Sequence, residues 1–334
     1  MRLFYNLTGH SQKMIILDCE TYANYFLVSM LDTATNKTID FELYDNHPID
    51  SKKLAAILRQ HTTIGFNSSN YDLPVIVAAL RGDNNAQIKQ LSDDIINAPK
   101  VWPVLKKHKI NIPASFDHID IMPIPIGQAS LKIYGGRLHA QKLQDLPIEP
   151  SAIIIASQRA TLREYCHNDL QVTRILYDEL KPQIALREQM SKQYDIDLRS
   201  NSDAQIAENV IKHELEAKNI DCTRPTVKIG TKYKYTKPKH ITFKSQLFND
   251  IVAMIERTDF VVNDNGQVAL PNDLLTKISF DGAEYQLGIG GIHSCESSQA
   301  VIAQDDECLF DVDVASYYPY LIIDGQYYPK HLTR

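Results

Sequence analysis

Short apolar runs recur along the first part of the chain, and several of them predict β-strands. Residues 14–17 are continuously apolar, residues 25–31 nearly so, and residues 38–44 alternate between apolar and polar positions. Shorter runs at 62–66 and 116–122 predict two further strands. Three strands are therefore expected in succession before the first helix.

Helical spacing of apolar residues separates and follows these strands. It is present over 52–60, and a second helix is expected over 72–80, with a proline near its first turn, where proline is tolerated. Residues 158–194 are mostly helical in pattern, with an interruption expected near Pro182. Strands followed by strands that alternate with helices predict an α/β domain that ends near residue 195.

The second part of the chain has a weaker pattern. Helices are expected over 200–215 and 243–255, and a β-rich run lies at 309–314. Asparagine and glycine clusters at 263–266 and 288–291 are turn signals. Since no internal repeat or low-complexity linker is present, no sharp domain boundary is indicated.

Composition excludes several classes of protein. With 334 residues, 44% hydrophobic and 23% charged, the chain is typical of soluble globular proteins with about two domains. No apolar stretch approaches the roughly 18 residues of a membrane span, and residues 1–10 lack the apolar core of a secretory signal. We therefore expect a cytoplasmic location and no membrane partner. Five scattered cysteines without a C-x-x-C pair favour reduced thiols over disulfides or a zinc site.

Paired acids at the end of the first strand are the first candidates for chemistry. Asp18 and Glu20 are two residues apart, so both carboxylates point to the same side of a strand. Converging carboxylates repel one another unless a cation lies between them, and oxygen ligands suit Mg²⁺ or Mn²⁺. The alternative is solvated surface charge, since Asp305 and Glu307 repeat the spacing in a polar stretch.

Two further segments carry acids in suggestive positions. Asp72 stands where a strand gives way to a helix, although an acid there can simply cap the helix. Tyr165 and Asp169 are four residues apart and share a helix face, a spacing that Tyr320 and Asp324 repeat. Each signal is therefore weak when taken alone.

Together and in this order, the three segments resemble the motifs of the DEDD superfamily of 3′–5′ exonucleases, in the variant with a tyrosine in the third motif. The matching residues are Asp18-Cys19-Glu20-Thr21, then Phe66-Asn67 through Tyr71-Asp72, and then Tyr165 with Asp169. Glu164 stands where the histidine variant would have its histidine. The resemblance implies a ribonuclease-H-like fold, a mixed sheet flanked by helices, with a two-metal site.

The same resemblance implies a role for each matching residue. Two Mg²⁺ or Mn²⁺ ions would be held, directly or through water, by Asp18, Glu20, Asp72 and Asp169. Tyr165 would help to orient the attacking water. The residues near the 3′-terminal nucleotides would be Thr21, Phe66 and Asn67. Such chemistry is sensible in itself, because two cations about 4 Å apart activate a water and stabilise the leaving oxygen.

A second resemblance lies near the end of the chain. Residues 311–319 are similar to motif A of family B DNA polymerases, Asp-x-x-Ser-Leu-Tyr-Pro, with Tyr317 in place of the commoner leucine. Asp313 matches the metal-binding aspartate, and Tyr318 matches the tyrosine under the incoming sugar. Residues 288–291 are weakly similar to a tyrosine–glycine–glycine element of phage enzymes, but a glycine-rich turn without a functional role is the alternative.

The two resemblances together imply the N-terminal part of a phage-type family B DNA polymerase. We expect a proofreading exonuclease over 1–195 without a separate domain before it, a connecting region over 196–300, and the start of the polymerase palm over 301–334. Because neither the fingers lysine motif nor the Asp-Thr-Asp motif follows motif A, the chain alone should act only as an exonuclease.

The expected partners follow from this interpretation. They are a single-stranded 3′ end, primer–template DNA, and a C-terminal polymerase fragment or other replication proteins, in the host cytoplasm if the chain is phage-encoded. Two alternatives stay open. One is a stand-alone or split-gene exonuclease, and the other is a non-catalytic DNA-binding subunit.

Charge is unevenly distributed along the chain. The net charge of −6 argues against a protein that simply coats a polyanion, yet residues 224–244 contain seven basic residues and no acid. Lys232 and Lys234 alternate with tyrosines there, a mixture suited to the backbone and bases of single-stranded DNA. The alternative is a solvated loop whose cations offset acidic neighbours.

Overall fold

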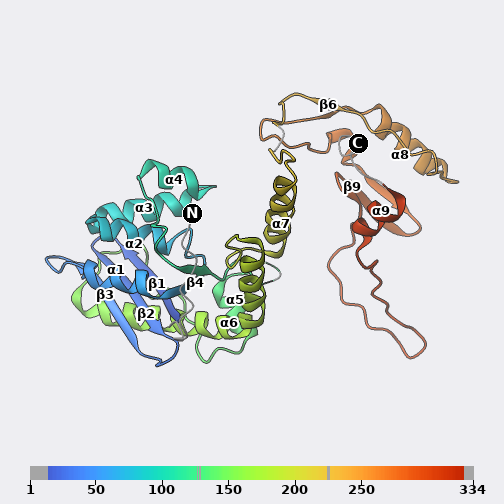
Figure 1. The fold of residues 1–334 in the computed structure, drawn as a ribbon. Coiled ribbons are helices and arrows are strands. Elements are labelled where there is room, and N and C mark those ends of the chain that lie inside the picture. The colour runs from blue at the N-terminus through green and yellow to red at the C-terminus, as the bar shows by residue number, and fades with distance from the viewer. Residues whose placement is uncertain (1–13, 126, 128, 224–225, 327–334) are drawn as a thin grey trace. The chain divides into compact units, whose positions relative to one another are not determined.

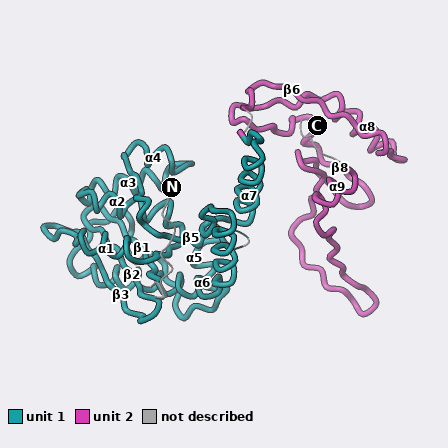
Figure 2. Tube along the Cα trace, viewed as in Figure 1, with its two compact units in different colours: residues 1–222 teal, residues 223–334 magenta. Residues whose placement is uncertain are grey.

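The computed structural model describes residues 14–125, 127, 129–223 and 226–326. The chain divides into two compact units, residues 1–222 and 223–334, and each is described by itself (Figure 2). None of the helices in the described ranges is both long and apolar enough to cross a membrane.

A mixed five-stranded sheet forms the centre of the first unit. Its strands are β1 (Met14–Tyr22), β2 (Tyr25–Asp32), β3 (Thr38–Tyr44), β4 (Thr62–Gly65) and β5 (His118–Asp120). The order is β3-β2-β1-β4-β5, with β1, β2 and β3 antiparallel and β4 and β5 parallel to β1 (Figure 1). The five predicted strands and the mixed α/β class are confirmed, and β1 continues past its apolar run through the paired acids.

Helices cover both faces of this sheet. One face packs on α1 (Ser51–Gln60), α2 (Asp72–Arg81), α3 (Asn85–Asn97) and α4 (Val101–Lys107). The other packs on α5 (Leu131–Arg137) and α6 (Arg159–Tyr194), which follows the short 3-10 helix Ala156–Gln158. Alternation along β1 supplies both layers, since Ile15 and Leu17 enter the first core and Ile16 the second.

The long helix α6 runs without a break, so the predicted interruption near Pro182 is wrong. Proline lacks an N–H group, which leaves the carbonyl of Asp178 without its helical partner. Pro182 is exposed, so water can satisfy that carbonyl. Leu180 and Ile184, on either side of Pro182, stay buried in the core cluster beside the sheet, which keeps the helix continuous here.

The first unit extends past the predicted end of the exonuclease domain at residue 195. Helix α7 (Asp203–Ala217) begins with a capping box between Ser202 and Gln205, close to the predicted 200–215. The buried Arg187 of α6 pairs with Asp203 at 2.5 Å and donates to the carbonyl of Asn201 at 2.9 Å. These contacts attach the start of α7 to α6, which explains why the first unit ends at residue 222 and not near residue 195.

The second unit has less regular structure. Its elements are β6 (Lys232–Tyr233), α8 (Gln246–Arg257), β7 (Phe260–Val261), the 3-10 helix Asn272–Leu274, β8 (Lys277–Phe280), β9 (Ala283–Gly288), β10 (Gly291–Ser294) and α9 (Tyr317–Gly325). Strand β6 pairs with β7, and β8, β9 and β10 form a three-stranded antiparallel sheet. The glycine-rich segment 288–291 is the turn between β9 and β10, and the predicted helix at 243–255 corresponds to α8.

The β-rich run at 309–314 forms no strand, so this prediction is wrong. Phe310 and Val312 are more than four-fifths exposed. A strand needs a neighbour to pair its N–H and C=O groups. No described strand pairs with this segment.

Candidate active site

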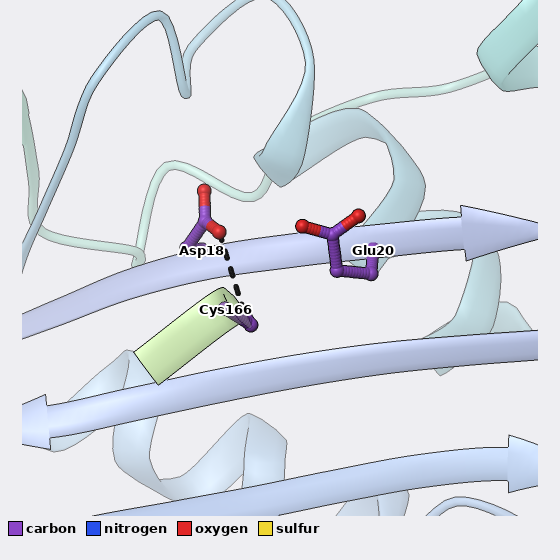
Figure 3. Close-up of side chains that lie close together, drawn as sticks. All are labelled: Asp18, Glu20 and Cys166. Carbon is purple, nitrogen blue, oxygen red and sulfur yellow. Dashed lines mark hydrogen bonds between the residues drawn. The ribbon is translucent and has the colours of Figure 1, made fainter. Parts of the chain in front are cut away.

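Asp18 and Glu20 extend from the same face of β1, as their two-residue spacing predicts (Figure 3). Both are half-buried, whereas the intervening Cys19 points into the core on the opposite face. Two acids thus interrupt the otherwise apolar surface of the central strand. Such a position is unfavourable for two carboxylates unless their charge is balanced.

Cys166 of α6 reaches the same pair of acids, a contact that sequence reasoning missed. Its Sγ donates a hydrogen bond to Asp18 Oδ2 at 3.3 Å. One ligand atom each from Asp18, Glu20 and Cys166 lies within 4.8 Å of the other two. The sequence does contain a signal for this contact, because Cys166 is three residues before Asp169 and therefore shares its helix face.

Asp72 is the first residue of α2 and is only 4% exposed. The helix cap is Tyr71, with no side-chain capping bond, so Asp72 is not the N-cap that its position allowed. Its Oδ1 atom is buried without a hydrogen-bond partner. Burial is the main reason that the pKa of Asp72 is raised to about 7. A hydrogen bond from Cys19 lowers this pKa, and the charge of Asp120 raises it.

Tyr165 and Asp169 lie on α6 at the edge of the same cluster. Burial raises the pKa of Asp169, and a hydrogen bond from Tyr165 partly opposes this rise. The pKa of Tyr165 is raised as well, first by burial and then by the charges of Asp169 and Glu20. Tyr165 is therefore a neutral hydroxyl donor beside a group of carboxylates.

The acids act on one another electrostatically. Burial is the largest cause that raises the pKa of Asp18, followed by the charges of Asp72, Glu20 and Asp169. For Glu20 the causes are burial and then the charges of Asp169 and Asp72. Four carboxylates from β1, α2 and α6 therefore share one charged region. Together with the unpartnered Asp72 oxygen, this donor set fits hard divalent cations such as Mg²⁺ or Mn²⁺.

A cavity of about 330 Å³ opens beside Tyr165 and Asp169. Its lining consists of Ser130, Leu131, Lys132, Leu143, Gln144, Tyr165, Asn168, Asp169 and Val172. Gln144 Oε1 and Asn168 Nδ2 are buried without a hydrogen-bond partner. The cavity thus combines apolar walls with polar groups next to the acids, as binding sites for small polar ligands do.

The loop between β4 and α2 is held by Asp120, a second residue that sequence reasoning missed. Asp120 is 3% exposed and accepts the backbone N–H groups of Asn67 at 2.9 Å and Ser69 at 3.0 Å. Its own N–H donates to Ser200 Oγ at 2.9 Å. Because this loop leads directly into Asp72, Asp120 helps to position that carboxylate.

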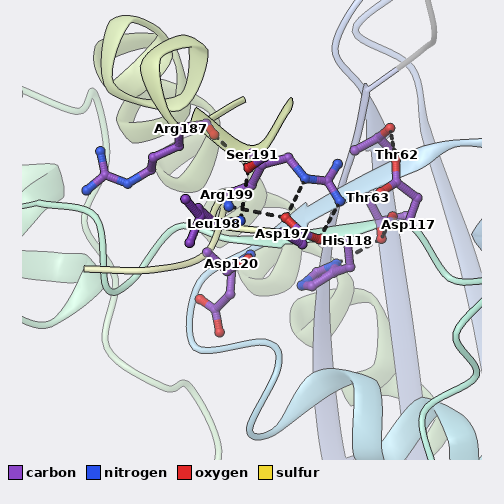
Figure 4. Close-up of polar contacts among 11 residues, drawn as sticks. Thr62, Thr63, Asp117, His118, Asp120, Arg187, Ser191, Asp197, Leu198 and Arg199 are labelled. Atoms are coloured by element: carbon purple, nitrogen blue, oxygen red, sulfur yellow. Dashed lines mark hydrogen bonds and ion pairs between the residues drawn. The ribbon is translucent and has the colours of Figure 1, made fainter. Parts of the chain in front are cut away.

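A polar network supports the strands behind this loop (Figure 4). Arg199 pairs with Asp117 at 2.7 Å and with Asp197 at 2.8 Å, and the Thr62 hydroxyl donates to Asp117. His118 lies between the hydroxyls of Thr63 and Ser68, and burial depresses its pKa to about 3. The segment after α6 is thereby tied to the edge of the sheet that carries the loop.

Gly65 has no room for a side chain, so Gly65→Ala should destabilise the first unit by about 1–3 kcal/mol. An added Cβ would stand 2.5 Å from Ser68 Cβ, and Ser68 is fully buried and bonded to His118 at 2.7 Å. Gly136→Ala, in α5, is the matched control, since the added Cβ would make only an ordinary 3.7 Å contact with Leu143. Calorimetry should show a lower thermal midpoint for Gly65→Ala alone. Equal midpoints would contradict this packing.

The other predicted site residues of the first unit lie around the acids. Phe66 packs on the core, with its ring edge-on to Tyr134 at a centroid distance of 6.1 Å. Asn67 adopts a positive φ of 56° in the loop before α2. Thr21 is buried beside Tyr71, and strand alternation puts its side chain on the face opposite Asp18 and Glu20.

Four predicted site residues belong to the second unit. Asp313 lies in exposed coil, and Tyr318 is in α9 with its ring 5.5 Å from that of Tyr317. Lys232 and Lys234 both pair with Asp259, at 3.1 and 3.2 Å. The acid that offsets these two lysines therefore comes from outside the basic segment.

Neither a family of known proteins nor a curated protein sequence matches this chain. Functional inference therefore rests on the sequence motifs of this chain and on the geometry of its site.

Proposed function

We propose that the first unit is a metal-dependent 3′–5′ exonuclease with a ribonuclease-H-like fold. The observation that carries the proposal is the pair Asp18 and Glu20 on one face of β1, on which the charges of Asp72 and Asp169 act. These acids come from three elements that are far apart in sequence, with Tyr165 beside them. The mixed sheet with helices on both faces is compatible with this fold, and the motif resemblance supports the same reaction.

The residues have distinct tasks in this proposal. Two bound divalent cations would supply an activated water and stabilise the leaving oxygen of a phosphodiester. The four carboxylates fix the cations, and Asp120 keeps Asp72 in place through the loop it holds. The neutral Tyr165 hydroxyl is suited to orienting a water by a hydrogen bond. The neighbouring cavity accommodates the 3′-terminal nucleotide.

Metal dependence tests this function. A 5′-labelled single-stranded oligonucleotide is incubated with the metal-free chain, with and without Mg²⁺ or Mn²⁺. We expect cleavage only with metal, and chelation should stop it. DNA binding without cleavage under every metal condition would support the non-catalytic alternative and overturn the exonuclease proposal.

The wider function proposed is that of the N-terminal portion of a phage-like family B DNA polymerase. Support for this comes from the sequence alone, in the motif around Asp313 and Tyr318 downstream of the exonuclease motifs. The exonuclease would then proofread a primer terminus. Polymerisation would need palm and fingers residues from a C-terminal polymerase fragment.

Lys232 and Lys234 should contribute to single-stranded DNA binding. Both lysine side chains are more than half exposed, so phosphates can replace Asp259 as their partner. Changing both to Ala should reduce the salt slope of binding by about 1.4, at about 0.7 for each phosphate contact. Fluorescence anisotropy over a salt series measures this slope. Lys52→Ala with Lys53→Ala, on α1, is the matched control, and equal slopes for the two double variants would show that the basic strand only decorates the surface.

A further inference from the structure

The thiol of Cys166 adds a sulfur atom to what is otherwise an oxygen site. It is fully buried, and the bond to Asp18 Oδ2 directs its sulfur toward the acids (Figure 3). The exonuclease resemblance assigns no metal-binding task to residue 166. Any role of this sulfur is therefore additional to the reaction proposed above.

Sulfur changes which metals the site prefers. Mg²⁺ and Mn²⁺ favour carboxylate oxygens, whereas Zn²⁺ and Cd²⁺ also bind thiolates strongly. Zinc takes four ligands, with Zn–S near 2.3 Å and Zn–O near 2.0–2.2 Å. One donor atom each from Asp18, Glu20 and Cys166 lies within 4.8 Å of the other two, so three potential ligands of one ion are grouped here.

Asp72, the first residue of α2, is the candidate for a fourth ligand. It is 4% exposed, and its Oδ1 atom has no hydrogen-bond partner. Its charge acts on both strand acids and raises the pKa of Asp18 and of Glu20. A buried carboxylate oxygen without a partner, on a residue whose charge acts on two of the three potential ligands, is independent support for a cation at this place.

We propose that Asp18, Glu20 and Cys166, with Asp72, form a mixed carboxylate–thiolate site for a thiophilic divalent cation such as Zn²⁺. When the ion binds, the Cys166 thiol releases its proton to solvent and the sulfur becomes a thiolate ligand. The consequence for catalysis rests on the proposed function. A thiophilic ion that holds Asp18 and Glu20 excludes the hard cations needed for cleavage, so it acts as an inhibitor of the exonuclease.

Cadmium is the probe, because a cadmium–thiolate bond absorbs in the near ultraviolet and reports on sulfur directly. The full chain, metal-free, carries Cys222→Ser, Cys295→Ser and Cys308→Ser to remove the less buried thiols. One equivalent of Cd²⁺ should produce the absorption band in this background. Adding Cys166→Ser should abolish the band. Absence of the band in the background, or its persistence without Cys166, overturns the proposal.

A second variant covers the case in which Cys166→Ser fails to fold. Asp18→Asn with Glu20→Gln keeps the sulfur and should raise the cadmium dissociation constant at least about 10-fold. Unchanged affinity would also overturn the site. Cleavage in Mg²⁺ alone is measured separately. If the triple-serine background shows the cadmium band but does not cleave DNA in Mg²⁺, only the exonuclease is refuted. If it cleaves DNA but shows no band, only the thiolate site is refuted.

Discussion

Changing Asp18 to Asn and Glu20 to Gln should reduce metal-dependent cleavage of single-stranded DNA by roughly 10²–10³-fold. The two carboxylates project from one face of β1 and share a charged region with Asp72 and Asp169. Loss of metal ligands removes several kcal/mol of transition-state stabilisation, which corresponds to a rate loss of about this size. Initial rates on an end-labelled oligonucleotide at saturating Mg²⁺ measure the effect.

The chain contains a matched control for this experiment. Asp305 and Glu307 have the same two-residue spacing but lie in an exposed segment of the second unit. Asp305→Asn with Glu307→Gln removes the same charges and should leave the rate within about 2-fold of the wild type. Equal rates for all three proteins would mean that cleavage does not depend on the acids of β1.

Asp72→Asn should make the metal-free first unit more stable at pH 8 by as much as about 4 kcal/mol. The pKa of Asp72 is raised from 3.8 to about 7, chiefly by burial. The native state therefore keeps a proton that the unfolded chain loses, and Asp72 contributes stability below pH 4 that is lost as the pH rises through about 7. Asparagine does not ionise in this pH range, so the variant does not lose stability in this way.

Wild type and Asp72→Asn have to be compared with one another, because the pH dependence that His118 gives to stability has the opposite sign to that of Asp72. Its pKa is depressed to about 3, so its contribution to stability grows as the pH rises from about 3 to 6.5. Thermal midpoints in chelator should be similar for wild type and Asp72→Asn at pH 4.5, and higher for the variant at pH 8. Added Mg²⁺ should stabilise the wild type more than the variant. If the variant is less stable than wild type at pH 8 in chelator, the ionised Asp72 side chain does not destabilise the native state as expected.

Local periodicity was enough to predict the parts of the site that lie on single elements. The two-residue spacing of Asp18 and Glu20 and the four-residue spacing of Tyr165 and Asp169 determine which side chains share a face. Helix α3 had an equally clear signal, with Ile88, Leu91 and Ile95 at helical spacing, yet no element was expected there. Helices α4 and α5 are short and contain proline or paired glycines, which hide their pattern.

Contacts between distant segments were beyond the pattern of the sequence. Cys166 meets Asp18 across 148 residues, and Asp120 holds Asn67 across 53. Both contacts depend on how α6 and β5 pack beside β1 and β4, which spacing alone does not specify. The run at 309–314 failed as a strand for a related reason, since strand formation depends on a pairing neighbour as well as on composition.

The direction of cleavage distinguishes a 3′–5′ exonuclease from an endonuclease and from a 5′–3′ exonuclease. Two 5′-labelled single-stranded oligonucleotides of one sequence are incubated with the chain and Mg²⁺, one with a free 3′ end and one with an inverted 3′-terminal nucleotide. We expect the free end to be shortened one nucleotide at a time and the blocked strand to stay intact. Internal cuts, or equal degradation of both strands, would contradict a 3′–5′ exonuclease built on Asp18, Glu20, Asp72 and Asp169.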